Sequence, residues 1–339
     1  MLILGIETSC DETAAAVVRD GREILSNVVV SQIDIFAEYG GVIPEIAARS
    51  HLEVMMPVIN KALSDANCNW DDIDAIAVTH APGLLGSLLI GTLTARTLAI
   101  LHSKPLYAVH HLKSHVYANW LSDATLPEFP LLALVISGGH TQILYMPAHN
   151  QFEIIGTTND DAVGECFDKV AKVLGLPYPG GPSIAKAAEN GDAFKYKLPH
   201  PKVEGLNFSF SGLKTAVLRA VQKEVGVPIS YPSHKLKELL SEQQVRDFAA
   251  SFQKTAVEIL DKKIQMALQQ YPNIKSVVVA GGVSANLALR KALPNAYFPA
   301  PSLSGDNGAM VAAACFYEIQ SGVEPTDPYG LNIYPRIQI

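Results

Sequence analysis

Cysteine is scarce in this sequence, and its cysteines are not spaced as metal-binding or redox pairs are. The four residues, Cys10, Cys68, Cys166 and Cys315, are widely separated and form no Cys-x-x-Cys pair. This spacing argues against a zinc ribbon or a disulfide framework and predicts a reducing compartment. Each cysteine is then expected to be a small buried residue.

Charged residues make up only 17% of the chain, and no basic leader precedes the first apolar segment. Residues 2–6 are apolar but are followed at once by Glu7, so they predict a strand rather than a signal peptide. The most apolar run, 84–101, contains Arg96 and four hydroxyl side chains, which suits a helix buried in protein better than one in lipid. We therefore predict a cytoplasmic protein without a membrane span.

The net charge of −7 argues against a broad nucleic-acid-binding surface. The charge is uneven, however, because residues 186–238 hold nine Lys or Arg against five Asp or Glu, a local +4. Such a region on an acidic protein could meet a phosphate backbone locally. An ordinary solvated surface explains it equally well.

At 339 residues the chain suits two domains, and ligands usually bind in clefts such as those between domains. Strand-like and helix-like segments alternate, as in 73–78, 84–101 and 106–110, which predicts an α/β fold. The helix-like segment 309–320 is expected to pack back on the first lobe.

The predicted boundary between the lobes is the stretch 127–130, because its paired prolines disfavour regular structure. We place residues 1–125 and 307–339 in the first lobe and residues 126–306 in the second. A nucleotide and a metal are expected to bind in the cleft between them.

Three turns rich in glycine or hydroxyl groups follow apolar segments, at 7–13, 137–141 and 281–286. The first two join strand-like segments as hairpins, and the third leads from a strand into a helix at 287–293. This imperfect repetition predicts two similar halves, each of which offers a turn to a shared ligand.

Glycines in such turns let the backbone approach a ligand and aim N–H groups at phosphate oxygens. Residues Ser137, Gly138 and Gly139 fit a phosphate cradle, although a Gly-Gly turn alone is more often a hairpin connector. Asn286, near a helix start, could hydrogen-bond a base or ribose. The Pro-Gly-Gly-Pro segment that contains Gly181 is either a nucleotide-binding loop or a structural turn.

His111 and His115 are four residues apart, so on a helix both imidazoles project from one face, while His110 points away. The best third ligand is Asp306, whose competing role is to cap the C-terminal helix. Two histidines and one carboxylate suit Fe(II) or catalytic Zn(II). A pair of hydrogen-bonded structural histidines is the alternative. A zincin-type peptidase is excluded because Leu112 stands where its general base would be.

Other carboxylates lie near the predicted cleft. Asp11 is in the first turn, and Asp161, Glu165 and Asp168 follow an i, i+4, i+7 pattern that predicts one helix face. This set either contains a ribose-binding Asp or is a solvated, salt-bridged helix face.

Many ordered motifs resemble the universal tRNA threonylcarbamoyladenosine transferases of the bacterial TsaD type, over nearly the whole chain. The motifs lie at 5–13, 40–45, 82–84, 111–115, 137–141, 164–169, 178–182, 208–214 and 281–286. The chain departs from the family pattern at His80-Ala81, at Cys166 and at Ala185, where some relatives offer an acidic ribose contact.

The resemblance implies a two-lobed α/β fold of the actin/Hsp70/sugar-kinase type with duplicated ribonuclease-H-like lobes. By position it makes His111, His115 and Asp306 the ligands of one divalent metal, Fe(II) before Zn(II). It implies that the adenylate is held by Val135, Ile136, Ser137, Gly138, Gly139, Asp168, Gly181 and Asn286.

The implied reaction moves the threonylcarbamoyl group from threonylcarbamoyl-AMP to N6 of adenosine 37 in tRNAs that read codons beginning with A. The implied partners are tRNA, an inactive paralogue of the TsaB type and a small ATPase of the TsaE type. We assign Asp11 as a base or orienting group in this transfer. A sugar-kinase-like ATPase and a non-catalytic nucleotide-binding scaffold are the competing interpretations; the first ordinarily uses Mg²⁺ with oxygen ligands, against which the two histidines argue.

Overall fold

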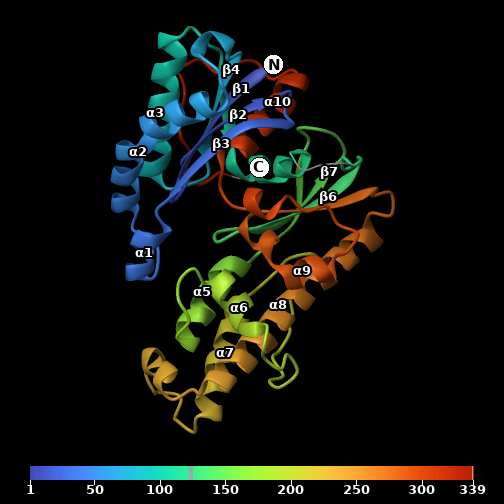
Figure 1. Ribbon diagram of the computed structural model, residues 1–339. Coiled ribbons are helices and arrows are strands. Elements are labelled where there is room, and N and C mark those ends of the chain that lie inside the picture. The colour runs from blue at the N-terminus through green and yellow to red at the C-terminus, as the bar shows by residue number, and fades with distance from the viewer. Residues whose placement is uncertain (122–124, 338) are drawn as a thin grey trace. The chain divides into compact units, whose positions relative to one another are not determined.

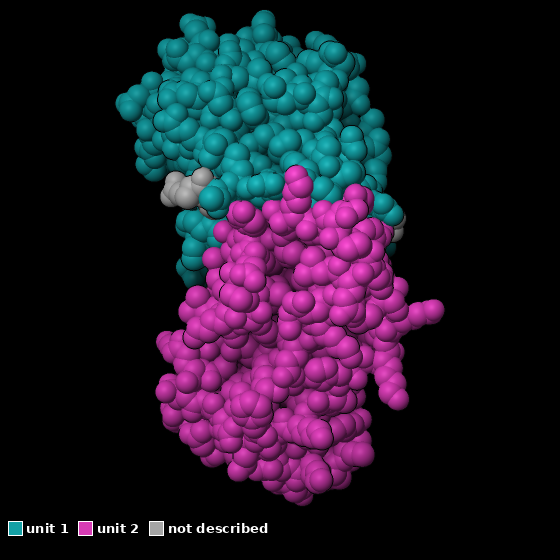
Figure 2. Space-filling model, turned by 90° about the vertical axis from the view of Figure 1, so that its right-hand side faces the viewer, with its two compact units in different colours: residues 1–131, 146–153, 299–339 teal, residues 132–145, 154–298 magenta. Residues whose placement is uncertain are grey.

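The computed structural model describes residues 1–121, 125–337 and 339, in which groups of strands are followed by groups of helices (Figure 1). Residues 1–131, 146–153 and 299–339 form a first compact unit, and residues 132–145 and 154–298 form a second (Figure 2).

The division predicted from the sequence differs from this one in three segments, 126–131, 146–153 and 299–306, which it placed in the second lobe. Contacts within the first unit explain the difference. His149 stacks on Tyr317 with 4.2 Å between ring centroids, and the Asp306 carboxylate lies beside His115. The shared cleft for nucleotide and metal stays a prediction.

The first unit is built on a five-stranded sheet with the order β3-β2-β1-β4-β5. Neighbours β1, β2 and β3 are antiparallel, whereas β1 is parallel to β4 and β4 to β5. The strands are β1 Leu2–Glu7, β2 Glu12–Arg19, β3 Glu23–Ser31, β4 Ala75–Ala81 and β5 Leu106–His110. The predicted first hairpin, β1 and β2 joined by a polar turn, is confirmed.

Helices cover both faces of this sheet, as Figure 1 shows. They are α2 Pro44–Asp65, α3 Leu85–Leu101, α4 His111–Tyr117 and α10 Gly308–Gln320, while the short helix α1 Ile33–Tyr39 follows β3. Leu4 and Ile6 pack in one core with residues of α2 and α3. Because side chains alternate along a strand, Gly5 faces the other way, where a Cβ atom would lie 2.2 Å from the carbonyl oxygen of Gly308. The prediction that the C-terminal helix packs on the first lobe is confirmed.

Segment 84–101, predicted to be a helix buried in protein rather than in lipid, is the helix α3, and only one of its faces is buried. Leu88, Ala95 and Leu98 of α3 are buried, but Leu85 and Leu89 are 60% and 43% exposed. The helix is therefore apolar on its solvent face as well as on its core face. No helix in the described ranges combines the length and the apolar character that crossing a membrane requires. All four cysteines are free, as predicted, but only Cys166 and Cys315 are buried, so the expected burial is wrong for Cys10 and Cys68.

The second unit holds, apart from their outermost residues, the strands of a four-stranded sheet with the order β8-β7-β6-β9. They are β6 Leu131–Ile136, β7 Thr141–Met146, β8 Glu153–Thr157 and β9 Ser276–Ala280. Its helices are α5 Val163–Leu174, α6 Gly180–Ala188, α7 Ser211–Glu224, α8 Glu242–Gln270 and α9 Leu287–Ala292. Side chains from the sheet and from α5, α7 and α8 form its hydrophobic core. The predicted second hairpin and the predicted strand, turn and helix at 276–292 are both confirmed.

Candidate metal centre and nucleotide-binding turns

Two buried histidines lie on one face of α4, which begins where strand β5 ends. The rings of His111 and His115 have centroids 4.6 Å apart, as their four-residue spacing predicts. His110, the last residue of β5, does not belong to the same group of potential ligands. The helix that follows β5 thus places two imidazoles side by side.

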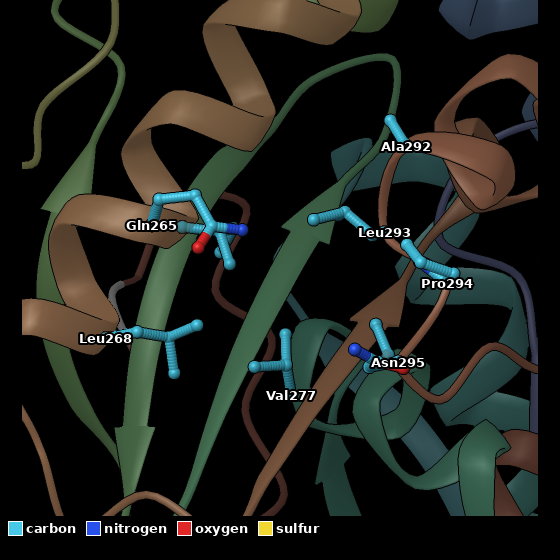
Figure 3. Close-up of a pocket in the computed structure, with 9 residues that line it drawn as sticks. Gln265, Leu268, Val277, Ala292, Leu293, Pro294 and Asn295 are labelled. Atoms are coloured by element: carbon cyan, nitrogen blue, oxygen red, sulfur yellow. The ribbon is translucent and has the colours of Figure 1, made fainter.

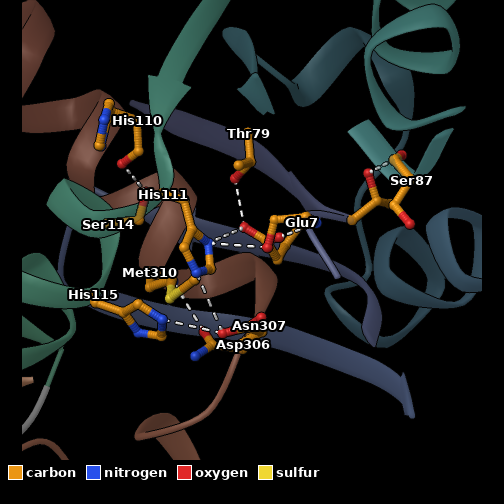
Figure 4. Close-up of polar contacts among 12 residues, drawn as sticks. Glu7, Thr79, Ser87, His110, His111, Ser114, His115, Asp306, Asn307 and Met310 are labelled. Atoms are coloured by element: carbon orange, nitrogen blue, oxygen red, sulfur yellow. Dashed lines mark hydrogen bonds and ion pairs between the residues drawn. The ribbon is translucent and has the colours of Figure 1, made fainter. Parts of the chain in front are cut away.

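Asp306 supplies the carboxylate, from the segment just before α10 (Figure 4). Its Oδ1 lies 3.1 Å from Nε2 of His115 and 3.7 Å from Nε2 of His111. The cap of α10 is a different residue, Asn307, whose Oδ1 accepts a hydrogen bond of 3.0 Å from the N–H of Met310. Capping is therefore not the role of Asp306.

The donor atoms of His111, His115 and Asp306 all lie within 4.8 Å of one another. Against burial, which lowers it, the negative charges of Asp306 and Glu7 raise the pKa of His111 to about 9. Burial would raise the pKa of Asp306, but His111 and His115 hold it below its ordinary value. Two imidazole nitrogens that converge on one carboxylate oxygen fit a divalent cation such as Fe(II) or Zn(II).

A second carboxylate, Glu7, was not among the predicted site residues, although it is fully buried beside His111. The alternation along β1 could have found it, because Ile3, Gly5 and Glu7 share the face that α10 covers. The sequence shows that Glu7 is charged, but it does not show that Glu7 lies beside His111 of α4.

The first turn, between β1 and β2, contains Asp11, and Glu12 directly after it begins β2. Burial, followed by the charges of Asp306 and Asp11, raises the pKa of Glu12 to about 10. His51 of α2, also not predicted, holds the turn: its Nδ1 lies 2.7 Å from Oγ1 of Thr13, and its Nε2 lies 3.0 Å from the carbonyl oxygen of Cys10. The turn is thus an acidic loop that the side chain of His51 holds in place.

The turn between β6 and β7 rests on the start of α5. Its ends are tied because the N–H of Ser137 donates to the carbonyl oxygen of His140 at 2.9 Å. A Cβ atom at Gly164 would lie 2.5 Å from the carbonyl oxygen of Ser137, so the turn and helix are in close contact. Cβ atoms at Gly138 and Gly139 would instead meet open space.

The two predicted ligand residues before this turn are placed differently. Val135 and Ile136 are 0% exposed, and their side chains belong to the interior of the unit. Only their backbone atoms could therefore reach a ligand.

Asp168 lies on α5 and contacts the first turn of α6, so Gly181, which we predicted to lie in a loop or turn, belongs to the start of a helix. Its Oδ1 accepts a hydrogen bond of 2.6 Å from the N–H of Gly180. A Cβ atom at Gly180 would lie 2.5 Å from the Cα of Asp168, whereas one at Gly181 would meet nothing within 4 Å. The first glycine of the pair is thus needed for packing, and the second faces open space.

The predicted helix face of Asp161, Glu165 and Asp168 is partly wrong, because α5 begins only at Val163. Asp161 precedes the helix, where its Oδ1 lies 2.7 Å from Nζ of Lys169. The same amine lies 2.9 Å from Oε1 of Glu165. For these two carboxylates the salt-bridge interpretation is confirmed.

Asn286 follows the glycine turn after β9 and begins α9. Its Oδ1 accepts hydrogen bonds from the N–H groups of Ala288 and Leu289 at 2.9 and 3.1 Å, and its Nδ2 donates to Oε1 of Gln253 at 2.8 Å. The side chain therefore caps a short helix. Gly281 has a φ of +87°, which favours glycine, whereas a Cβ atom at Gly282 would meet open space.

A pocket of about 160 Å³ lies elsewhere in the second unit, at the start of β9 (Figure 3). Leu268, Val277 and Leu293 give it a largely apolar lining, and Gln265 and Asn295 are its polar side chains. The glycine turn follows the other end of β9, about 13 Å along the strand from Val277 at the usual rise per residue. The pocket is thus separate from the predicted nucleotide-binding residues.

The family model of the TsaD proteins, described as tRNA N6-adenosine threonylcarbamoyltransferase, matches residues 23–313. The chain belongs to the TsaD family. A protein of that name from Symbiobacterium thermophilum is 50% identical over 331 residues, with 95% of this chain and 93% of the relative covered. One from Caldicellulosiruptor saccharolyticus is 46% identical, with 100% and 98% covered. The chain is therefore a transferase of the TsaD family along its whole length.

Two solved structures with low sequence identity share the fold. The activator of the 2-hydroxyisocaproyl-CoA dehydratase from Clostridium difficile, with bound ADPNP, has a TM-score of 0.51 at 14% identity and covers 96% of this chain and 100% of its own. Component A of the Acidaminococcus fermentans (R)-2-hydroxyglutaryl-CoA dehydratase has a TM-score of 0.50 at 16% identity, with 95% and 99% covered. The expected two-lobed α/β fold of this TsaD protein, of the actin/Hsp70/sugar-kinase type, is confirmed.

Proposed function

We propose that this chain transfers the threonylcarbamoyl group from threonylcarbamoyl-AMP to N6 of adenosine 37 in tRNAs that read codons beginning with A. The observation that carries the proposal is the convergence of His111, His115 and Asp306 in a chain of the TsaD family. In the reaction the N6 nitrogen forms a bond to the carbamoyl carbon, and the bond from that carbon to the phosphate oxygen breaks. AMP leaves with the bonding electrons, and the amine loses a proton.

The three converging side chains would hold one divalent metal, for which we favour Fe(II) over Zn(II). When bound, such an ion supplies Lewis-acid stabilisation of negative charge on carbamoyl or phosphate oxygens. The donor set supports this assignment, because the two imidazoles and one carboxylate leave coordination positions for substrate oxygens. The same set argues against a kinase-like ATPase, whose Mg²⁺ takes oxygen ligands.

The second unit would hold the adenylate. Gly138, Gly139 and Gly181 support this role, because each would direct a Cβ atom into open space that a ligand can fill instead. Backbone N–H groups in such turns bind phosphate oxygens well. Asp168 and the backbone of residues 135–137 complete the proposed binding residues. The amide group of Asn286 already forms hydrogen bonds within the protein. Its proposed role is therefore indirect: it fixes the start of α9.

The tRNA would contact the basic region 186–238. Among the described residues none of its nine Lys or Arg side chains forms an ion pair with a carboxylate. Cations that are not neutralised within the protein can displace the counterions of a phosphate backbone. We place the reaction in the cytoplasm, where the tRNA substrate is found.

We also propose that an inactive paralogue of the same fold docks on the apolar face of α2 and α3, and that a small ATPase joins the complex. Leu52 of α2 is 68% exposed, and Leu85, Leu89 and Leu93 recur on α3 at the spacing of one helix face. The two helices touch near this face, since a Cβ atom at Gly86 would lie 2.9 Å from that of Ala48. Exposed apolar patches of this kind are typical of protein interfaces.

The activity is tested by incubating the chain, with its partner proteins, threonylcarbamoyl-AMP and unmodified tRNA, and analysing the nucleosides by mass spectrometry. We expect threonylcarbamoyladenosine to form, and none to form with a tRNA that has guanosine at position 37. Without ATP the reaction should still proceed, because the donor is already activated. No modified nucleoside in the full mixture, together with release of ADP from ATP by the chain without its partners, would contradict the proposal and favour the ATPase alternative.

A further inference from the structure

Glu7 is a buried carboxylate at the end of β1, and it has no role in the transfer proposed above. It is 0% exposed, and a carboxylate in such a place is costly unless its charge is compensated. Thr79 lies on the neighbouring strand β4, directly after the residue that pairs with Ile6. The sheet itself therefore fixes where the Glu7 side chain lies.

Three groups donate hydrogen bonds to this carboxylate (Figure 4). Oε1 accepts from the N–H of Ser9 at 2.5 Å, and Oε2 accepts from the hydroxyl of Thr79 at 2.5 Å. Nδ1 of His111 lies 3.2 Å from the same Oε2. The hydrogen bonds from Ser9 and Thr79 hold the carboxylate in place, and the third contact joins it to the imidazole of His111.

The contact with His111 determines which ring nitrogen carries the proton. An ionised carboxylate can only accept hydrogen bonds, so Nδ1 must be protonated to face it. The lone pair of the neutral ring then lies on Nε2, the nitrogen that points toward Asp306. The oxygen of Ser9, 3.2 Å from Nδ1, can accept from the same N–H group.

We propose that Glu7 is a positioning residue of the metal centre, which orients His111 through Nδ1 so that Nε2 presents its lone pair to the metal. This inference rests on the proposed metal site. A divalent ion held there would balance the charges of Glu7 and Asp306, and both histidines would then be neutral. Carboxylates that accept from a metal-bound histidine in this way orient the ring and make it a stronger ligand.

The two histidines are accordingly not equivalent. Nδ1 of His115 has no hydrogen-bond partner among the described residues, whereas Nδ1 of His111 faces both Glu7 and Ser9. Glu7 therefore acts on one ligand only. Its loss should weaken metal binding without abolishing it.

The test is a competitive titration of Zn(II) against a chromophoric chelator, with the full chain as wild type and as Glu7→Gln. Glu7→Gln keeps the shape of the side chain but removes its charge, and we expect the Kd for Zn(II) to rise roughly 10- to 100-fold, as for other such partners of metal ligands. The absorption bands of the Co(II)-substituted protein should also shift, which a change in overall stability alone would not produce.

Glu318→Gln in α10 is the matched control, because Glu318 is also buried and acidic but lies outside the ligand group. It should bind Zn(II) as the wild type does. If Glu7→Gln does not fold, Thr79→Val removes one of the hydrogen bonds that fix the carboxylate, and a rise of severalfold in the Kd is expected. A folded Glu7→Gln protein with unchanged Kd and unchanged Co(II) bands, or an unchanged Kd in Thr79→Val where that variant is used, would overturn the proposal.

The proposed metal site fails differently. If the wild type binds no more Zn(II) than a His111→Ala, His115→Ala double variant does, the ligand group itself is wrong. If the wild type binds tightly and Glu7→Gln binds equally well, only the role of Glu7 is refuted.

Discussion

Asp11 is the residue that we assign to the departing proton or to the orientation of the amine. It lies in the turn after β1. After burial, the charges of Asp306 and of Asp11 itself raise the pKa of its neighbour Glu12. Asp11→Ala should lower turnover roughly 100-fold, the usual effect of losing a general base, and should leave adenylate binding nearly unchanged. Single-turnover kinetics and a direct binding titration separate the two quantities, with Asp11→Asn as the matched variant. Equal losses in both would reject the role.

We expect His51 to make the stability of the folded state depend on pH. Its burial lowers its pKa below the ordinary value of 6.5, although the carbonyl of Cys10 and nearby carboxylates oppose this. The unfolded chain then binds a proton that the folded chain does not, so stability present above pH 6.5 is lost as the pH falls. One such group changes the free energy of unfolding by up to about 1.4 kcal/mol per pH unit.

The measurement is urea unfolding of the wild type and of His51→Gln at pH 7.5, 6.5 and 5.5. The wild type should lose more stability toward pH 5.5 than the variant does. Parallel pH profiles would show that His51 does not cause the dependence.

At the residue scale, the sequence predicts side chains that lie close along the chain and misses those that converge from far apart. The spacing of His111 and His115 is a local property of one helix, so it was sufficient to pair them. Glu7 reaches His111 across 104 residues, through the register of β1, β4 and β5. No local pattern contains that register.

The turn between β6 and β7 offers a prediction at the scale of an element. Gly138→Ala would place its Cβ atom in open space, so the free energy of unfolding should hardly change. Adenylate binding should weaken roughly tenfold, about 1.4 kcal/mol, because the backbone could no longer approach a phosphate as closely.

Gly164→Ala is the control for that variant, since its Cβ atom would lie 2.5 Å from the carbonyl oxygen of Ser137 and should destabilise the fold. Isothermal titration with a stable adenylate analogue and thermal unfolding measure the two effects. Normal adenylate affinity in Gly138→Ala would argue against the phosphate cradle.

Elements with strong apolar patterns were predictable to within a few residues. The segments predicted at 106–110 and 84–101 are β5 Leu106–His110 and α3 Leu85–Leu101, whereas the strand predicted at 73–78 is β4 Ala75–Ala81. The start of α5 was not predictable, because the carboxylate of Asp161 continues the helical spacing although its backbone lies before the helix. Likewise, the sequence left the amide of Asn286 available for a ligand, but in the fold it forms hydrogen bonds with the start of α9 and with Gln253.

The apolar face of α2 and α3 carries a prediction for the whole molecule. Leu89→Lys places a charge on a side chain that is 43% exposed, so the isolated chain should stay folded. Binding of the paralogue should weaken at least tenfold, because a buried charge without a partner is costly at an interface. Sedimentation of the chain with and without the paralogue tests this, with Ile229→Lys, at a 69% exposed side chain of the second unit, as control. Equal binding by the Leu89→Lys protein would place the interface elsewhere.

The division of the whole molecule was predictable only in outline. The prolines at 127–130 lie directly before the change of unit at 131 and 132. The return of residues 146–153 to the first unit was hidden, because it depends on the stacking of His149 with Tyr117 and Tyr317. These three aromatic residues are far apart in sequence.

The most direct test of the account is the metal dependence of the transfer. The protein is stripped with a chelator, and threonylcarbamoyladenosine formation on unmodified tRNA is measured before and after Fe(II) is returned under anaerobic conditions. The account predicts that the stripped wild type loses activity and regains it with Fe(II), while the His111→Ala, His115→Ala double variant does not. Full activity in a wild-type protein shown to hold no metal would contradict it.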